Sequence, residues 1–147
     1  GSWRLAGDVE HAGPVHFIQM WVLPDTPGLE PGYEQLDIRT QLDSGDFVVV
    51  ASGLPEHASE SAIRIRQSQA GLLVGQLTRD ATHLLPDAPL LHVFVAEGVV
   101  RLETGEVLEA GDSARLVDAG GLRLTAGPVG AQVLVWQMGV EALAVGV

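Results

Sequence analysis

Residues 91–116 have the sequence LHVFVAEGVVRLETGEVLEAGDSARL, and this stretch decides the fold class. Its apolar runs are rich in β-branched residues and are short enough for β-strands. These runs cover residues 90–96, 99–102, 107–108 and 113–117. The pairs that separate them form turns easily, namely Glu97-Gly98, Thr104-Gly105 and Gly111-Asp112. The pattern predicts a series of short strands joined by tight turns.

Similar segments continue on both sides of this stretch. The most apolar of them is VHFIQMWVL at 15–23, which predicts a strand buried on both faces or nearly so. The other predicted strands cover 34–39, 47–51, 61–67, 71–77, 122–125 and 131–138. No segment of ten residues combines a helical period with capping residues. About ten or eleven short strands at this spacing predict an antiparallel sandwich or barrel.

Composition limits the domain count and the chemistry. The chain has 147 residues, which suits one domain, and we expect that domain to cover 3–139. Residues 1–2 resemble a cloning remnant, and the apolar residues 140–147 are expected to form a tail. The absence of Cys excludes disulfides and thiol nucleophiles, and the absence of Lys excludes Schiff-base chemistry.

Charge and hydropathy limit the partners and the location. The formal net charge is −11, so phosphate backbones and acidic membrane surfaces are unfavourable partners. No apolar run is long enough to span a bilayer, and no basic segment precedes an apolar one as in a signal peptide. We therefore expect a cytoplasmic protein that binds neither nucleic acid nor membrane.

Several segments resemble a known family. The order of strands and turns over 91–116 is similar to the second half of a cupin motif. The segment PVHFIQMWVLPDTPGLEPGYEQ, residues 14–35, resembles the opening of the C-terminal half of pirin-like proteins, and GLLVGQL, HLLPDAPLLHVFVAEGVV and VLVWQM also fit that half. The chain thus resembles the C-terminal cupin domain of a pirin-like, quercetin 2,3-dioxygenase-type bicupin protein. The resemblance implies a cupin-type antiparallel β-barrel or sandwich, a double-stranded β-helix of jelly-roll type.

The resemblance also implies where the metal belongs. In this family three His and one Glu of the N-terminal cupin hold the metal, and the last two lie in a segment of the type AGxGxxHSE. The present sequence has neither an HxH followed by Glu nor an HSE. We therefore expect no metal ligand here, and iron or another divalent metal in an N-terminal cupin that precedes this chain.

The five histidines are the first candidates for a site. They are His11, His16, His57, His83 and His92. No two are at positions i and i+2, so no strand presents two imidazoles on one face. His92, which Glu97 or Glu103 could approach, is a pocket or rim residue, and His16 beside Gln19 lines the pocket, faces the other domain or packs in the core. The pocket candidates are therefore His16, Gln19, His92 and Glu97, with no catalytic residue assigned and His57 expected in a surface loop.

Other polar residues have simpler interpretations. Glu34 and Gln35 follow a turn, and we expect them to hold backbone groups in place. Arg64 and Arg66 share one face of a predicted strand, which favours a surface ion pair over anion recognition. No GxSxG, GxGxxG or HExxH motif is present, so nucleophile-elbow, dinucleotide and zinc-protease chemistry lack support.

Three functions fit these observations. In the first, the chain is a non-metal cupin domain that packs on a metal-bearing N-terminal cupin and shapes its pocket. The parent protein would then be a quercetin 2,3-dioxygenase, or no enzyme, and the chain alone would be inactive. In the second, the chain is a stand-alone module that binds a small aromatic ligand. In the third, it is a protein-interaction module whose Trp21 segment or tail 140–147 is exposed, with self-association of the chain expected.

Overall fold

The computed structural model of the chain describes residues 16–140. Strands dominate the fold, and they are β1 (Phe47–Ser52), β2 (Ile63–Arg64), β3 (Ala70–Leu77), β4 (Thr82–Leu84), β5 (Leu90–Leu102), β6 (Val107–Glu109), β7 (Ser113–Val117) and β8 (Arg123–Met138). The helical elements are α1 (Arg39–Leu42) and one 3-10 turn (Pro55–His57). No helix within 16–140 is long and apolar enough to cross a membrane. The prediction of an all-β fold is confirmed.

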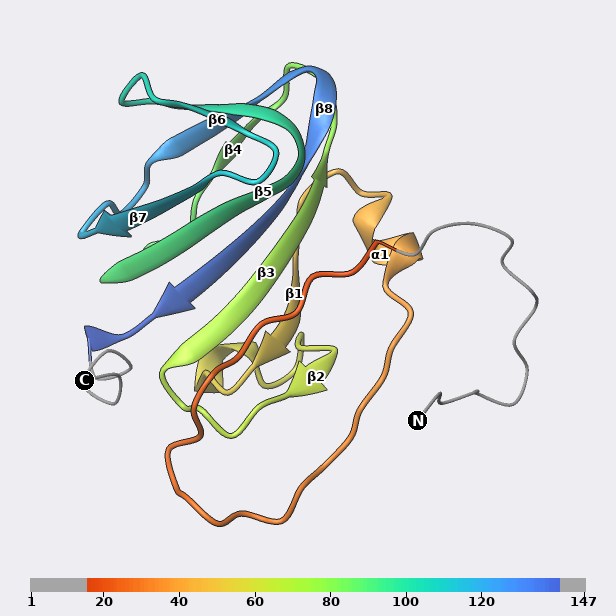
Figure 1. Cartoon of the computed structure of the whole chain (residues 1–147), viewed down its shortest axis with the longest axis vertical. Helices are drawn as coiled ribbons and strands as arrows, with labels where there is room; N and C mark the ends of the chain where they lie inside the picture. The colour runs from red at the N-terminus through yellow and green to blue at the C-terminus, as the bar shows by residue number, and fades with distance from the viewer. Residues whose placement is uncertain (1–15, 141–147) are drawn as a thin grey trace.

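The two longest strands, β5 and β8, organise the sheet (Figure 1). They pair antiparallel from Leu90 opposite Met138 to Leu102 opposite Leu124. On the far side of β8 lie β3, along its C-terminal half, and β4, along its N-terminal half. On the far side of β5 lie β7 and β6. β1 extends the sheet beyond β3, and β2 pairs parallel with β1 at its edge.

The β5–β8 ladder bends where two glycines meet. The register shifts between Val95 and Glu97 and again between Gly98 and Val100. Gly98 has a φ of +80°, and a Cβ at this position would lie 2.2 Å from the carbonyl oxygen of Gly130. The predicted turn at Glu97-Gly98 is therefore wrong, because Gly98 forms an irregularity within one continuous strand. The predicted strands 122–125 and 131–138 likewise join into β8.

The main core lies on one face of this ladder. Val93 is opposite Val135 and Val95 is opposite Val133, and all four are fully buried. Leu73, Leu77, Leu91 and further apolar residues of β1, β3, β5, β6 and β8 complete the cluster. Because side chains alternate along a strand, the residues between these valines point to the opposite face. That opposite face carries the candidate site.

Two predicted strands are wrong. The described part of 15–23 is extended but pairs with no strand within 16–140, because it crosses a face of the sheet and contacts it through side chains. The predicted burial on both faces is also wrong, since Ile18 is half-buried and the other residues of 16–23 are exposed. The predicted strand 34–39 is a loop that leads into α1, where the Asp37 carboxylate accepts a hydrogen bond from the backbone N–H of Arg39 at 3.1 Å. The predicted strand 61–67 shortens to β2.

The remaining strand predictions are confirmed within a few residues as β1, β3, β6, β7 and parts of β5 and β8. The sequence analysis did not predict β4. The expected cloning remnant at 1–2 lies outside the described residues, as does the expected tail except for Val140.

Replacing Gly98 by Ala is expected to lower the free energy of unfolding by about 2 kcal/mol or more, since the change adds backbone strain and a clash with Gly130. The matched control is Gly121→Ala. Gly121 has a similar φ of +74°, but a Cβ there would meet no atom within 4 Å. Strain alone predicts a loss of about 1 kcal/mol for the control. Urea unfolding of both variants measures the difference, and equal losses would contradict the close approach of β5 to β8.

Candidate functional site

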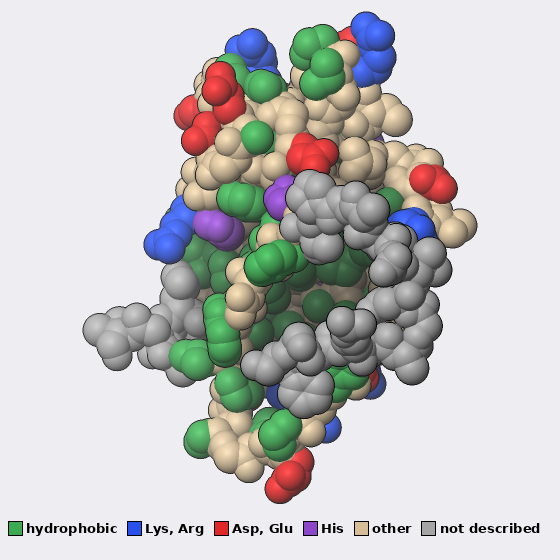
Figure 2. Space-filling model, turned by 45° about the vertical axis from the view of Figure 1, so that its right-hand side comes forward, with side chains coloured by type: hydrophobic (Ala, Val, Ile, Leu, Met, Phe, Trp, Pro, Cys, Tyr) green, Lys and Arg blue, Asp and Glu red, His purple; other side chains and the backbone are tan. Residues whose placement is uncertain are grey.

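The face of the sheet opposite the main core is apolar, and we call it the outer face. Its buried residues are Val50, Leu72 and Leu134. The partly buried residues packed against them are Ile18, Ile38, Val48, Ala51, Val74, Phe94, Ala96 and Trp136. A solvent-facing side of an antiparallel sheet normally carries polar residues, so a second apolar cluster here indicates a binding surface. Figure 2 shows hydrophobic side chains gathered on the face turned toward the viewer, with histidine side chains beside them.

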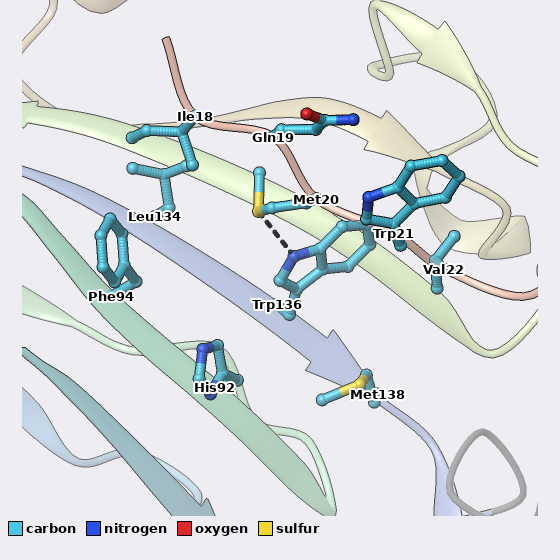
Figure 3. A pocket seen from close by; sticks show the side chains of 10 residues that line it. All are labelled: Ile18, Gln19, Met20, Trp21, Val22, His92, Phe94, Leu134, Trp136 and Met138. Carbon is cyan, nitrogen blue, oxygen red and sulfur yellow. Dashed lines mark hydrogen bonds between the residues drawn. The ribbon is translucent and has the colours of Figure 1, made fainter. Parts of the chain in front are cut away.

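Residues 16–23 run across the outer face (Figure 1). Ile18 packs against the apolar cluster, and the indole N–H of Trp136 on β8 donates a hydrogen bond to Sδ of Met20 at 3.0 Å (Figure 3). Phe17 and Trp21 stay 75% and 88% exposed. The segment therefore attaches through alternate side chains and leaves large apolar groups in solvent.

A groove of about 360 Å³ lies between this segment and the strands below it. The residues that line it are Ile18, Gln19, Met20, Trp21 and Val22 from the segment, His92 and Phe94 from β5, and Leu134, Trp136 and Met138 from β8 (Figure 3). The β5–β8 register places the strand residues of the groove next to one another, because His92 is opposite Trp136 and Phe94 is opposite Leu134. The lining is apolar apart from the Gln19 amide, the His92 imidazole and the Trp136 N–H, a composition typical of small-molecule sites and of protein interfaces.

His92 is the titratable residue of the groove. Burial lowers the pKa of its imidazole below the ordinary value, and the nearby positive charge of Arg115 on β7 lowers it further. The ring is therefore mainly neutral near pH 7, with one nitrogen that donates and one that accepts. A neutral imidazole can hydrogen-bond a hydroxyl or amide without placing a charge in an apolar site.

The four predicted pocket residues lie in two pairs. Gln19 and His92 both line the groove. His16 Nδ1 lies 3.5 Å from Oε1 of Glu97, and both side chains are more than half exposed. Glu97 thus pairs with His16, whereas Glu103 pairs with Arg123 at 3.3 Å, and the expected approach of either carboxylate to His92 does not produce an ion pair within 16–140. An exposed pair of this kind contributes little stability.

The other histidines lie away from the groove. His57 was expected in a surface loop, but it is half-buried in the 3-10 turn and its Nδ1 is 3.0 Å from the hydroxyl of Ser52. His83 on β4 lies 3.4 Å from the Asp46 carboxylate. His11 is outside the described residues. Within 16–140, no group of three or more His, Asp or Glu side chains has an arrangement that could hold a metal ion.

The loop that follows the segment is fastened by polar contacts. The Glu34 carboxylate accepts a hydrogen bond from the backbone N–H of Arg64 at 2.7 Å, in line with the expected backbone-holding role. Gln35 instead accepts a hydrogen bond from the Tyr33 hydroxyl. The surface ion pair expected for Arg64 and Arg66 is wrong for the described part of the chain, where neither guanidinium pairs with a carboxylate.

Most of the groove was not predicted from the sequence. The Trp21 segment was expected to be exposed, but the residues missed as groove lining are Ile18, Met20, Trp21, Val22, Phe94, Leu134, Trp136 and Met138. The available signal was the run VLVWQM, in which both alternating faces of one strand are apolar while only one can face the main core.

Acidification is expected to destabilise the protein through His92. The unfolded chain has a histidine of ordinary pKa, 6.5, so it binds the proton more readily than the folded chain does. Stability should therefore fall as the pH drops from about 7.5 to about 5.5. The His92→Gln variant should lose part of this dependence, and the His16→Gln variant, altered at an exposed side chain, should keep it. Thermal unfolding across this pH range measures both, and an unchanged slope in His92→Gln would contradict the assignment.

Comparisons with known proteins agree with this fold. No protein-family model matches the sequence. A Mycobacterium tuberculosis protein named "Putative quercetin 2,3-dioxygenase Rv0181c" is 42% identical over 125 residues, which are 85% of this chain and 50% of the relative. A Mycobacterium bovis protein with the same descriptive name, Mb0187c, gives the same values. The chain therefore spans about half the length of the curated relatives it matches.

Two solved structures share the fold. Escherichia coli YhhW superposes with a TM-score of 0.65 at 20% identity, over 80% of this chain and 47% of YhhW. The nickel(II) complex described as bacterial pirin YhhW gives a TM-score of 0.64 at 20% identity, over 81% and 48% of the two chains. Likeness at this identity shows the fold alone, and it again covers half of the longer chain. The chain therefore has the fold of one half of YhhW and is similar in sequence to one half of the mycobacterial proteins named putative quercetin 2,3-dioxygenase.

Proposed function

We propose that this chain is the metal-free half of a two-cupin protein. Its outer face packs against a second, metal-bearing cupin, and it shapes the pocket of that cupin. The observation that carries the proposal is the apolar outer face, which exposes Phe17 and Trp21 to solvent in the chain as it stands. Large exposed apolar groups beside a groove are typical of surfaces that a partner covers. The relatives, twice as long as the matched region, supply the length for such a partner.

The described residues do not fit a metal site, so the proposal assigns iron or another divalent metal to the second half. An octahedral or tetrahedral centre needs several imidazole or carboxylate ligands converging on one ion. His92 is the one imidazole in the groove, and Glu97 is paired with His16 outside its lining. This chain therefore contributes apolar walls, the Gln19 amide and one neutral imidazole to the shared structure.

For the whole protein we propose dioxygenation of a flavonol, following the names of the mycobacterial relatives. This chain alone would be inactive. Its apolar groove would exclude water and contact the planar, aromatic part of such a substrate or the neighbouring domain. The absence of cysteine is compatible with a reducing compartment, and we propose the cytoplasm as its location.

A second candidate function is a stand-alone module for a small aromatic ligand. The groove favours it, because Trp21, Phe94 and Trp136 provide aromatic surface and His92 provides a neutral hydrogen-bonding group. A ligand that binds only the folded state must raise the melting temperature. A rise with flavonols in the wild type, lost in Trp136→Ala and kept in Val129→Ala, would favour the module over the packing domain.

Metal analysis tests the proposal that the metal is bound by the second cupin and not by this chain. The purified chain, expressed with added iron, nickel or manganese, is expected to hold substoichiometric metal, since no ligand cluster is present within 16–140. The second experiment uses a hybrid protein, in which this chain replaces the matching 125 residues of the Mycobacterium tuberculosis relative. The hybrid should retain one metal per polypeptide after dialysis and unfold as one cooperative unit.

Two outcomes would contradict the proposal. One is a tightly held, stoichiometric metal in this chain alone, measured by plasma mass spectrometry. The other is a hybrid whose halves unfold independently in calorimetry, which would show that the outer face does not pack on the second half.

A further inference from the structure

The backbone of residues 17–23 is extended but unpaired. Within 16–140, the contact to its main-chain groups is a hydrogen bond from the Gln67 side chain to the carbonyl of Leu23 at 3.1 Å. The next residue with a backbone hydrogen bond is Asp25, whose N–H donates to the carbonyl of Arg66 at 2.8 Å. A strand-like segment with both edges open is a template for pairing with another strand.

Apart from Gln19, the side chains of the segment are apolar on both sides. Ile18, Met20 and Val22 line the groove, and Gln19 and Trp21 also contribute to its lining. Phe17, Trp21 and Leu23 are 75%, 88% and 56% exposed. No residue between 17 and 23 is charged. Strands with apolar residues on both faces are normally buried between two layers. The outer face provides one layer for residues 17–23, and no element within 16–140 provides the other.

We propose that residues 17–23 join the β-sheet of the second cupin as an added strand. The proposal rests on the proposed function, which supplies that cupin. Strand addition would satisfy the open main-chain groups and bury Phe17 and Trp21 under the sheet of the partner. The segment would then be a shared element, attached to this domain through alternate side chains and to the partner through hydrogen bonds of its backbone.

The partner is assigned to the second cupin for two reasons. The curated relatives and YhhW each leave about half of a longer chain unmatched, which is enough for another domain of this size. The alternative partner is a second copy of this chain, and the net charge of −11 on each copy opposes that contact.

Amide hydrogen exchange tests the strand directly. In this chain alone, the amides of 17–23 should exchange rapidly, because they have no acceptor among the described residues. In the hybrid with the Mycobacterium tuberculosis relative, alternate amides of the segment should slow by about 100-fold or more, as in a paired strand. The amide of Thr104, which is exposed in the β5–β6 turn and has no acceptor within 16–140, serves as the internal reference for fast exchange.

Substitutions separate backbone pairing from side-chain contact. Gln19→Pro and Met20→Pro each remove one amide, and neighbouring amides point to opposite edges of a strand. At least one of the two is expected to abolish the slowed exchange in the hybrid. Trp21→Ala should weaken the protection, whereas Val129→Ala, which alters an 84% exposed valine on β8, should not. Thermal unfolding of this chain alone, with each substitution, shows whether the domain still folds.

Each outcome decides the proposal. A cooperative, metal-loaded hybrid with fast exchange at 17–23 would overturn the strand and leave the proposed function standing. Protection that survives both proline substitutions would also overturn it, because side-chain contact would then suffice. Halves that unfold independently would overturn the proposed function and remove the partner of the strand. Sedimentation of this chain as a dimer, with 17–23 protected and Trp21→Ala monomeric, would overturn the assignment to the second cupin.

Discussion

The long antiparallel ladder between β5 and β8 is the constraint on which the rest of the structure depends. It places Val93 against Val135 and Val95 against Val133 on the core side. It also determines what lies on the other side, because His92 and Trp136 are cross-strand neighbours in the same register. A shift of one residue in this pairing would exchange the two faces. The close approach of Gly98 to Gly130 bends the ladder and helps to fix the register.

The same ladder explains why the chain has two apolar clusters. A sheet with one solvated face needs apolar residues at alternate positions only, yet β5 and β8 carry them at nearly every position between 90 and 96 and between 131 and 136. Within 131–136 of β8, the main core uses the odd-numbered positions. The even-numbered positions form the outer face, which residues 16–23 cover in part. The domain thus folds on one cluster and leaves the other partly open, in agreement with the proposed function.

The sequence predicted those strands that turn residues separate cleanly. β1 follows Ser44-Gly45-Asp46, and β7 follows Gly111-Asp112, and both were found close to their expected bounds. Gly98 was assigned to a turn because a glycine within an apolar run has the same local pattern in a turn and in a bulge. The segment 15–23 was assigned to a strand because its pattern reports that side chains need burial, whereas strand pairing depends on neighbours far along the chain.

The candidate site was predictable in part. His92 and Gln19 were expected near a pocket from their place in apolar segments, and both line the groove. Phe94 and Trp136 could not be placed beside them without the β5–β8 register, which joins residues that are some forty positions apart in sequence. Likewise, the contact from Trp136 to Met20 crosses 116 positions. Long-range pairing of this kind leaves no periodic signal in either segment alone.

The electrostatics of the groove agree with the supporting role proposed for this chain. A site that transfers protons or holds a metal concentrates charged or ligating groups and shifts their pKa values together. In this groove the shifted pKa belongs to the His92 imidazole, and burial together with the positive charge of Arg115 keeps that ring neutral. A neutral His92 brings one hydrogen-bond donor, one acceptor and no charge into an apolar interface, whereas a carboxylate or a charged imidazole would need an oppositely charged partner there. These properties support the proposal that another domain covers the groove, with His92 as its titratable hydrogen-bonding group.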